Sequence, residues 1–257
     1  MVNFKLFTFL LVASIYIVAF NSMIGQDVAQ LAMRARVNLY DNWHFDSVAY
    51  YFDKVIGKRY APAFAYSDYG WYLMLVDKYE EGLTYIQKAA KMDSRDKQLV
   101  AWNAWALLWD GDLPKAKNEI NKALAIDPNY GEALYVSSMI ASAMEDHNEA
   151  IRLAEKAAAN DPNWRGSIPL ALVKGGNREQ ALAWAEKIAE DENAFDAWLL
   201  MEVYAYLRNN DKALDYLRKS YELRFPFMPW LKLAPGLEHL RNDPRFETTV
   251  QKLDLPK

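Results

Sequence analysis

Few residues of this 257-residue chain have types and spacings that could support chemistry. The chain contains three histidines, His44, His147 and His239, and no cysteine. Each histidine stands without a second ligand four residues away, so the sequence predicts no zinc site. The lack of cysteine excludes disulfides, thiolate metal ligands and a cysteine nucleophile. We expect His44 and His147 to be solvated residues beside turns.

The acidic and glycine-rich stretches do not form a recognisable site either. Asp110-Gly111-Asp112 is faintly similar to a calcium loop, but no Glu stands at the later position that such a loop requires. Gly175-Gly176 follows no strand and precedes no Gly-Lys-Ser/Thr, which predicts a turn rather than a phosphate loop. No Ser/His/Asp arrangement is recognisable. We therefore predict that the protein is not an enzyme and uses no metal or cofactor.

The strongest pattern in the chain is a repeat with a period of 34 residues. Segments 116–130 and 150–164 have alanines at matching positions, and both end in Asp-Pro-Asn and an aromatic residue. Lysines keep this phase along the chain at intervals of 34, 34, 34, 31 and 32 residues, at Lys54, Lys88, Lys122, Lys156, Lys187 and Lys219. Six units of one repeat fit this phase, and a fixed period of this kind decides the architecture.

Each unit is predicted to be a hairpin of two helices. Small residues at matching positions let two helices approach closely, and Asp-Pro ends one helix and starts the next unit. The fifth unit is irregular, because Gly166 and Pro169 leave room for a first helix of only about 170–173. The predicted hairpins are 27–41 with 45–56, 63–76 with 79–92, 97–109 with 113–126, 132–143 with 148–158, 170–173 with 178–189, and 195–207 with 212–223.

These features resemble the tetratricopeptide repeat (TPR) family over about residues 29–225. The unit from Ala63 has family-like residues at Gly70, Leu73, Gly82, Ile86 and Ala89, and the next unit has them at Ala104, Leu107, Ala116, Ile120, Ala123 and Pro128. The sequence departs from the family at Tyr60, Ser94 and Asn193, where proline is common. The resemblance implies an all-α, right-handed superhelical α-solenoid of six hairpins with a C-terminal capping helix.

We divide the chain into three parts. Residues 1–26 are a signal anchor or signal peptide, residues 27–225 are the solenoid, and residues 226–257 are a linker and a capping helix. Pro226, Pro229 and Pro235 interrupt the periodicity and mark the linker. Asp243 and Pro244 start a closing helix that runs to about residue 253. We expect this helix to cover the apolar end of the stack.

The resemblance also predicts a binding surface. In TPR proteins the first helix of each hairpin lines a concave groove, and eight large side chains match such positions here: Trp71, Met74, Trp105, Trp109, Tyr135, Met139, Trp198 and Tyr206. We expect at least three of them to be exposed and to bind a helix or extended segment of a protein partner. The groove lacks the Lys and Asn pattern with which chaperone-binding relatives clamp a peptide carboxylate.

The N-terminal segment is different in kind. Phe4 to Ile24 is a largely apolar run of 21 residues, about the length that a bilayer requires. The small residues needed for signal cleavage fit poorly at Ala19-Phe20-Asn21, which favours an uncleaved anchor over a cleaved signal peptide. Lys5 favours a cytoplasmic N-terminus, although Arg34 and Arg36 argue weakly against it. We therefore expect the repeat domain to be extracytoplasmic (periplasmic).

A net charge of -4 gives no basic surface for nucleic acid. The leading hypothesis is a membrane-anchored scaffold, adaptor or assembly subunit that binds a partner segment in an apolar aromatic groove. One alternative is a secreted or periplasmic interaction protein released by signal cleavage. Another is the scaffold portion of a membrane-bound enzyme complex.

Overall fold

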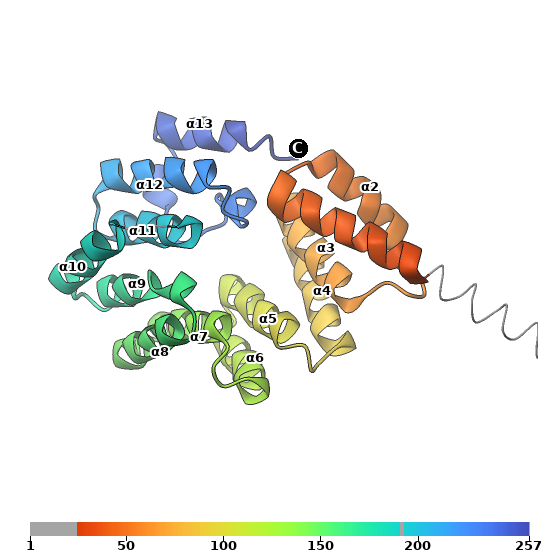
Figure 1. The fold of residues 1–257 in the computed structure, drawn as a ribbon, viewed down its shortest axis with the longest axis horizontal. Coiled ribbons are helices and arrows are strands. Elements are labelled where there is room, and N and C mark those ends of the chain that lie inside the picture. Colours follow the sequence, from red (N-terminus) through yellow and green to blue (C-terminus); the bar gives the residue numbers. More distant parts are fainter. Residues whose placement is uncertain (1–24, 191–192, 257) are drawn as a thin grey trace, which may run out of the picture.

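The computed structural model describes residues 25–190 and 193–256, and within these ranges all regular secondary structure is helical. Helical hairpins follow one another along the chain, and the stack curves so far that its two ends meet (Figure 1). The predicted all-α solenoid of TPR-like hairpins is therefore confirmed. The predicted anchor of residues 1–26 lies almost entirely outside the described residues.

The helices agree with the predicted hairpins to within a few residues. The first hairpin pairs a helix of residues 25–37, which ends in the π-helical turn η1 (Asn38–Asn42), with α2 (Phe45–Val55). The next helices are α3 (Ala63–Leu75), α4 (Tyr79–Met92), α5 (Lys97–Asp110), α6 (Leu113–Ile126), α7 (Gly131–Ala143) and α8 (His147–Asn160). The last units contain α9 (Ser167–Lys174), α10 (Arg178–Ile188), α11 (Ala194–Tyr206) and α12 (Asn210–Glu222), followed by α13 (Pro244–Lys252).

The first helix of the fifth unit is short, as predicted, but not as short as expected. Helix α9 has 8 residues, whereas α7 has 13. It starts at Ser167 instead of residue 170, because Pro169 falls in its first turn, where a proline displaces no intrahelical hydrogen bond.

The 34-residue phase is visible in the backbone as well as in the sequence. The turn inside each hairpin has a residue with positive φ, at Trp43, Asp77, Gly111, Glu145, Gly176 and Arg208. Their intervals are 34, 34, 34, 31 and 32 residues, the same as those of the lysines. Only two of the six are glycine, so these left-handed turns are imposed on side chains that disfavour them. The packing of the helices on each side therefore holds the turns in place.

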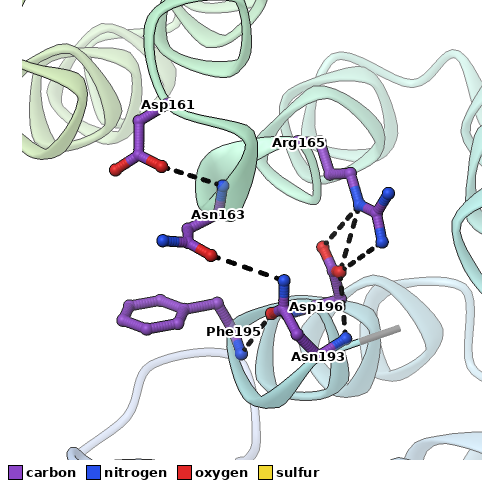
Figure 2. Close-up of polar contacts among 6 residues, drawn as sticks. All are labelled: Asp161, Asn163, Arg165, Asn193, Phe195 and Asp196. Carbon is purple, nitrogen blue, oxygen red and sulfur yellow. Dashed lines mark hydrogen bonds and ion pairs between the residues drawn. The ribbon is translucent and has the colours of Figure 1, made fainter. Parts of the chain in front are cut away.

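Buried carboxylates fix the register between neighbouring units at three junctions. Asp68 on α3 is fully buried and forms two hydrogen bonds with the Arg36 guanidinium of the preceding unit. The same arrangement recurs between Arg165 and Asp196, with Nη2 2.7 Å from Oδ2 (Figure 2). At a third junction Glu132 accepts a 2.8 Å hydrogen bond from the Trp102 indole. Removing one partner of such a pair would leave a buried charge without compensation.

The segment after α12 is the main departure from the predicted organisation. Residues 226–240, predicted to be a linker, enter the concave side of the solenoid and form two 3₁₀ turns, η3 (Met228–Trp230) and η4 (Glu238–Leu240). Met228, Leu231 and Leu237 are each 0% exposed. We call residues 225–240 the hub segment, because the hairpins curve around it.

Two further contacts close the ring. Helix α13 packs against α12, at the end of the stack that it was expected to cover. The Arg224 guanidinium lies 4.7 Å from the ring of Trp43 and donates to the main-chain oxygens of Asp41 and Asn42 in the first hairpin. Figure 1 shows the C-terminal end beside α2. The first and last hairpins are therefore in direct contact, although about 180 residues separate them.

Candidate partner-binding cleft

The eight residues predicted to line the groove separate into two groups. Five are buried: Trp71, Met74, Trp105, Tyr135 and Trp198. The other three are partly exposed: Trp109, Met139 and Tyr206. All eight lie on first helices of their hairpins, but most of this surface is covered.

The hub segment covers the three tryptophans of the buried group, with the Phe225 ring 4.9 Å from that of Trp198. The Phe227 ring lies 5.2 Å from the ring of Trp105, and the Trp230 ring lies 6.0 Å from that of Trp71. Trp230 also donates a 2.9 Å hydrogen bond from its indole to the main-chain oxygen of Trp71. The aromatic residues that look available in the isolated repeats therefore form a core with the chain's own C-terminal part. An apolar groove of this length would otherwise be exposed to water.

Part of the concave face remains open where the hub segment leaves it. This open part is a cleft of about 470 Å³, which we call the outer cleft. It is built from the C-terminal ends of α5, α7, α9 and α11, from the start of α6 and from the hub-segment turn around Leu233 and Pro235. Its lining is Leu108, Trp109, Leu113, Met139, Ser142, Ala143, Val173, Lys174, Tyr206, Leu233 and Pro235. The three partly exposed residues of the predicted set all belong to this cleft.

A smaller, more enclosed space of about 30 Å³, the inner cavity, adjoins the outer cleft. The two spaces share Trp109, Met139, Lys174 and Pro235 in their walls. Aromatic rings from α3, α5, α7, α11 and the hub segment make up most of the inner lining, and Glu202 is the carboxylate among them. The volume is enough for about two water molecules. It is too small for a side chain of a partner.

Two charged residues from different helices meet at the boundary between these spaces. Lys174 ends α9, and its ammonium lies 5.1 Å from the ring centre of Tyr206. Glu202 on α11 is 7% exposed. Burial raises the pKa of Glu202 from its ordinary 4.5 to about 7, although Lys174 and a hydrogen bond from Trp198 oppose the shift. Burial likewise lowers the pKa of Lys174, and Glu202 opposes that change.

The inner cavity also contains polar groups without a partner. The indole nitrogens of Trp71 and Trp105 are buried, and neither forms a hydrogen bond in the described part of the chain. Tyr206, at the outer rim, has its pKa raised to about 12 by burial and by the nearby carboxylates of Glu202 and Glu238. The hydroxyl of Tyr206 therefore stays neutral at physiological pH and can act as a hydrogen-bond donor.

The histidines and acidic residues were also compared with the expectations from the sequence. Among residues 25–190 and 193–256, no three His, Asp or Glu side chains are placed to hold a metal ion. His44 is exposed, as expected. His147 meets the expectation only in part: its side chain is partly exposed, but it lies beside Gly175, and its Nδ1 is buried without a hydrogen-bond partner among the described residues. No described helix is both long and apolar enough to span a bilayer.

Sequence reasoning missed the roles of Lys174, Glu202 and the hub segment. Lys174 precedes the Gly175-Gly176 turn and has the appearance of an ordinary helix end. Glu202 stands in the middle of the apolar stretch 197–205, and a lone acidic residue in such a stretch is the one available sign of a buried carboxylate. The aromatic residues among the prolines of the hub segment could also have been recognised as too apolar for a solvated linker.

Comparison with known proteins supports the fold. No family model matches the chain. A thermophilic TPR protein from Thermus thermophilus superposes with a TM-score of 0.52 and 20% identity, over 68% of this chain and 98% of that one. PilF of Pseudomonas aeruginosa gives 0.55 and 12% identity, over 89% and 99% of the two chains. A chain of the APC/C hetero-tetramer Cut9–Hcn1 gives 0.55 and 14% identity, over 85% and 48%.

One curated relative also matches in sequence. The DnaJ homolog subfamily C member 7 homolog of Dictyostelium discoideum is 33% identical over 91 residues. The match spans 35% of this chain but only 16% of that protein's length. The likenesses together show that this chain has the fold of TPR solenoids.

Proposed function

We propose that the protein is a protein-interaction scaffold that receives an apolar segment of a partner in the outer cleft. The observation that supports this proposal most strongly is that the hub segment fills most of the concave face but leaves an apolar cleft of about 470 Å³ open. Trp109, Met139 and Tyr206 pack against the core with one side and present the rest of their apolar surface in this cleft. Concave apolar clefts with a few polar groups are the usual binding sites of proteins. The TPR-type fold, which other proteins use for interaction, is consistent with this role.

The outer cleft also has the composition of a binding site rather than of a packing defect. Aromatic side chains and methionine are enriched at the centres of protein interfaces, and Trp109, Met139 and Tyr206 are of these types. They are held on three different helices, α5, α7 and α11, each packed against its own hairpin partner. The surface is therefore preorganised, which reduces the entropy lost on binding.

A peptide library tests this proposal even though the partner is unidentified. Random peptides displayed on phage are selected on the full-length protein, and selected peptides are titrated into Ala143→Trp. Ala143 lines the cleft but is exposed, so a tryptophan there fills the cleft without entering the core. We expect affinity to fall at least tenfold with an unchanged melting temperature. Peptides that bind Ala143→Trp as tightly as the wild type would contradict the cleft as the partner site.

We further propose that residues 4–24 stay attached and anchor the protein in a membrane, with the repeats on the extracytoplasmic side. The support is the 21-residue apolar run preceded by Lys5 and the poor fit of Ala19-Phe20-Asn21 to a cleavage site. The intact mass of the cellular protein, together with extraction by alkaline carbonate, tests this directly. A mature chain beginning after residue 21 or 25 would favour the released interaction protein instead. Co-purification with an enzyme activity would favour the scaffold portion of a membrane-bound enzyme complex.

A further inference from the structure

The outer cleft has one cationic side chain in an otherwise uncharged lining. That side chain is Lys174, which is half-buried at the boundary with the inner cavity. Among the described residues it forms no ion pair, and its ammonium rests on the face of Tyr206. Glu202 acts on it electrostatically from the inner cavity. A partner that enters the cleft thus meets the positive charge before it meets the negative one.

The charge of the partner's segment can be argued by comparing three cases. A purely apolar segment would cover Lys174 and remove its remaining water, which is costly for an unpaired charge. A segment with Lys or Arg would place a like charge against Lys174 in a desolvated site. A segment with Asp or Glu would supply the missing counter-charge, and the Tyr206 hydroxyl could donate to the same carboxylate. Only the third case improves the electrostatics of the bound state.

This inference rests on the proposed function of the outer cleft. We infer that the partner segment carries an acidic side chain next to its apolar anchor, and that Lys174 selects it. The apolar anchor packs on Trp109 and Met139, while the carboxylate pairs with the Lys174 ammonium. Lys174 thereby determines specificity, since the apolar walls alone would accept any hydrophobic segment.

The position of Lys174 indicates that its ion pair with the partner contributes a moderate amount to the binding free energy. An ion pair between exposed side chains contributes little, whereas close charge pairs at an interface couple more strongly because water is excluded around them. Lys174 is between these limits, because it is half-buried and already interacts with Glu202. We expect loss of the pair to weaken binding about tenfold, which corresponds to about 1.4 kcal/mol.

The experiment uses one peptide selected on the full-length protein and two changes in a double-mutant cycle. The acidic residue of the peptide is changed to Gln, and the protein is changed by Lys174→Met, with affinities measured by titration calorimetry. We expect each single change to weaken binding about tenfold. The two changes together should weaken binding little more than either one alone. Lys91→Met, on the exposed face of α4, is the matched control and should leave affinity unchanged. Lys174→Glu should invert the selection, so that the library yields peptides with Lys or Arg.

The experiments distinguish failure of the proposed selection by Lys174 from failure of the proposed binding site. In one outcome, Ala143→Trp blocks the selected peptides, but these peptides contain no acidic residue and bind Lys174→Met as tightly as the wild type. The proposed scaffold function then stands, and the proposed selection by Lys174 is wrong. If no peptide is sensitive to Ala143→Trp, the outer cleft itself is not the partner site. A melting temperature that is unchanged in Lys174→Met shows that the comparison is made between folded proteins.

Discussion

The indole of Trp230 donates its Nε1–H to the main-chain oxygen of Trp71, 2.9 Å away, across 159 residues of sequence. Trp71 is 1% exposed, as is Trp230. This bond joins the hub segment to the second hairpin at the centre of the ring. The concave face of the solenoid is therefore mainly an internal core, and within the described residues the outer cleft is the apolar part of it that stays open.

Trp230→Ala is expected to destabilise the fold strongly. It removes a buried tryptophan, and a large cavity of this kind costs about 3–5 kcal/mol. The free energy of unfolding from urea titration measures this loss. Trp184→Ala is the control, because Trp184 lies half-buried on α10, outside the hub, and should cost much less. Equal effects of the two substitutions would mean that the hub segment does not stabilise the ring.

Arg165→Met is expected to cost about 3–5 kcal/mol, because it leaves the buried Asp196 carboxylate without its counter-charge. Figure 2 shows how the guanidinium faces this carboxylate across the junction between the fifth and sixth units. Arg152→Met breaks an exposed pair with Glu149 and should cost less than about 1 kcal/mol. Thermal melts of both variants compare the two cases. A small loss in Arg165→Met would show that this junction does not depend on the pair.

Trp105→Ala and Trp109→Ala should have different effects, because Trp105 belongs to the buried core and Trp109 lines the outer cleft. Trp105 is buried against Phe227, so its loss should cost about 3–5 kcal/mol in stability. Trp109 packs on Trp71 but is partly exposed in the outer cleft, so its substitution should cost less stability than that of Trp105 and should weaken peptide binding. Melting temperature and peptide affinity, measured on both variants, give the comparison. The assignment fails if Trp109→Ala lowers the melting temperature as much as Trp105→Ala does.

Glu202→Gln is expected to stabilise the protein at alkaline pH. The pKa of Glu202 is raised to about 7 in the folded state, so the native protein holds this proton more tightly than the unfolded chain. The associated stability is complete below the ordinary value of 4.5 and is lost as the pH rises through 7. Gln imitates the protonated form, so we expect roughly 3 kcal/mol of added stability at pH 8. The attraction to Lys174 is already included in the raised pKa of Glu202.

The pH dependence of that difference is the informative measurement. Unfolding titrations at pH 5 and pH 8 should show a small difference between wild type and Glu202→Gln at pH 5 and a larger one at pH 8. The other groups around this site are Lys174, Tyr135, Tyr206 and Glu238. Burial moves the pKa of Tyr206 upward to about 12, and burial also raises the pKa of Tyr135 well above its ordinary value, so neither ionises in this range. A difference that does not change with pH would contradict a Glu202 that titrates near neutrality.

The hairpins could be predicted from the sequence because their determinants are local and periodic. The small residues and the lysine phase recur every 31–34 residues, Asp-Pro marks two of the junctions, and together they predict helix positions to within a few residues. The hub segment could not be predicted in this way. Its burial depends on contacts such as that of Trp230 with Trp71, which no periodic pattern encodes. Proline at 226, 229 and 235 breaks helices, and it indicates nothing about where the segment packs.

Only part of the candidate site could be predicted from the sequence. The family resemblance places Trp109, Met139 and Tyr206 on the inner face, and in the structure they line the outer cleft. The resemblance places Trp71 and Trp105 on that face equally well, and the difference between the two groups is made by Phe227 and its neighbours in the hub segment. Lys174 and Glu202 line the same cavity because α9 and α11 pack against each other. This proximity could be recognised only once the arrangement of the two helices in space was known.

Hydrogen–deuterium exchange of the full-length protein, with and without a selected peptide, tests the central claim most directly. We expect added protection at the C-terminal ends of α5, α7, α9 and α11, which line the outer cleft, and unchanged protection in residues 225–240. That result would place the partner in the cleft beside an intact hub segment. Faster exchange throughout residues 225–240 on peptide binding would contradict the claim, because it would show that the partner displaces the hub segment and occupies the whole groove.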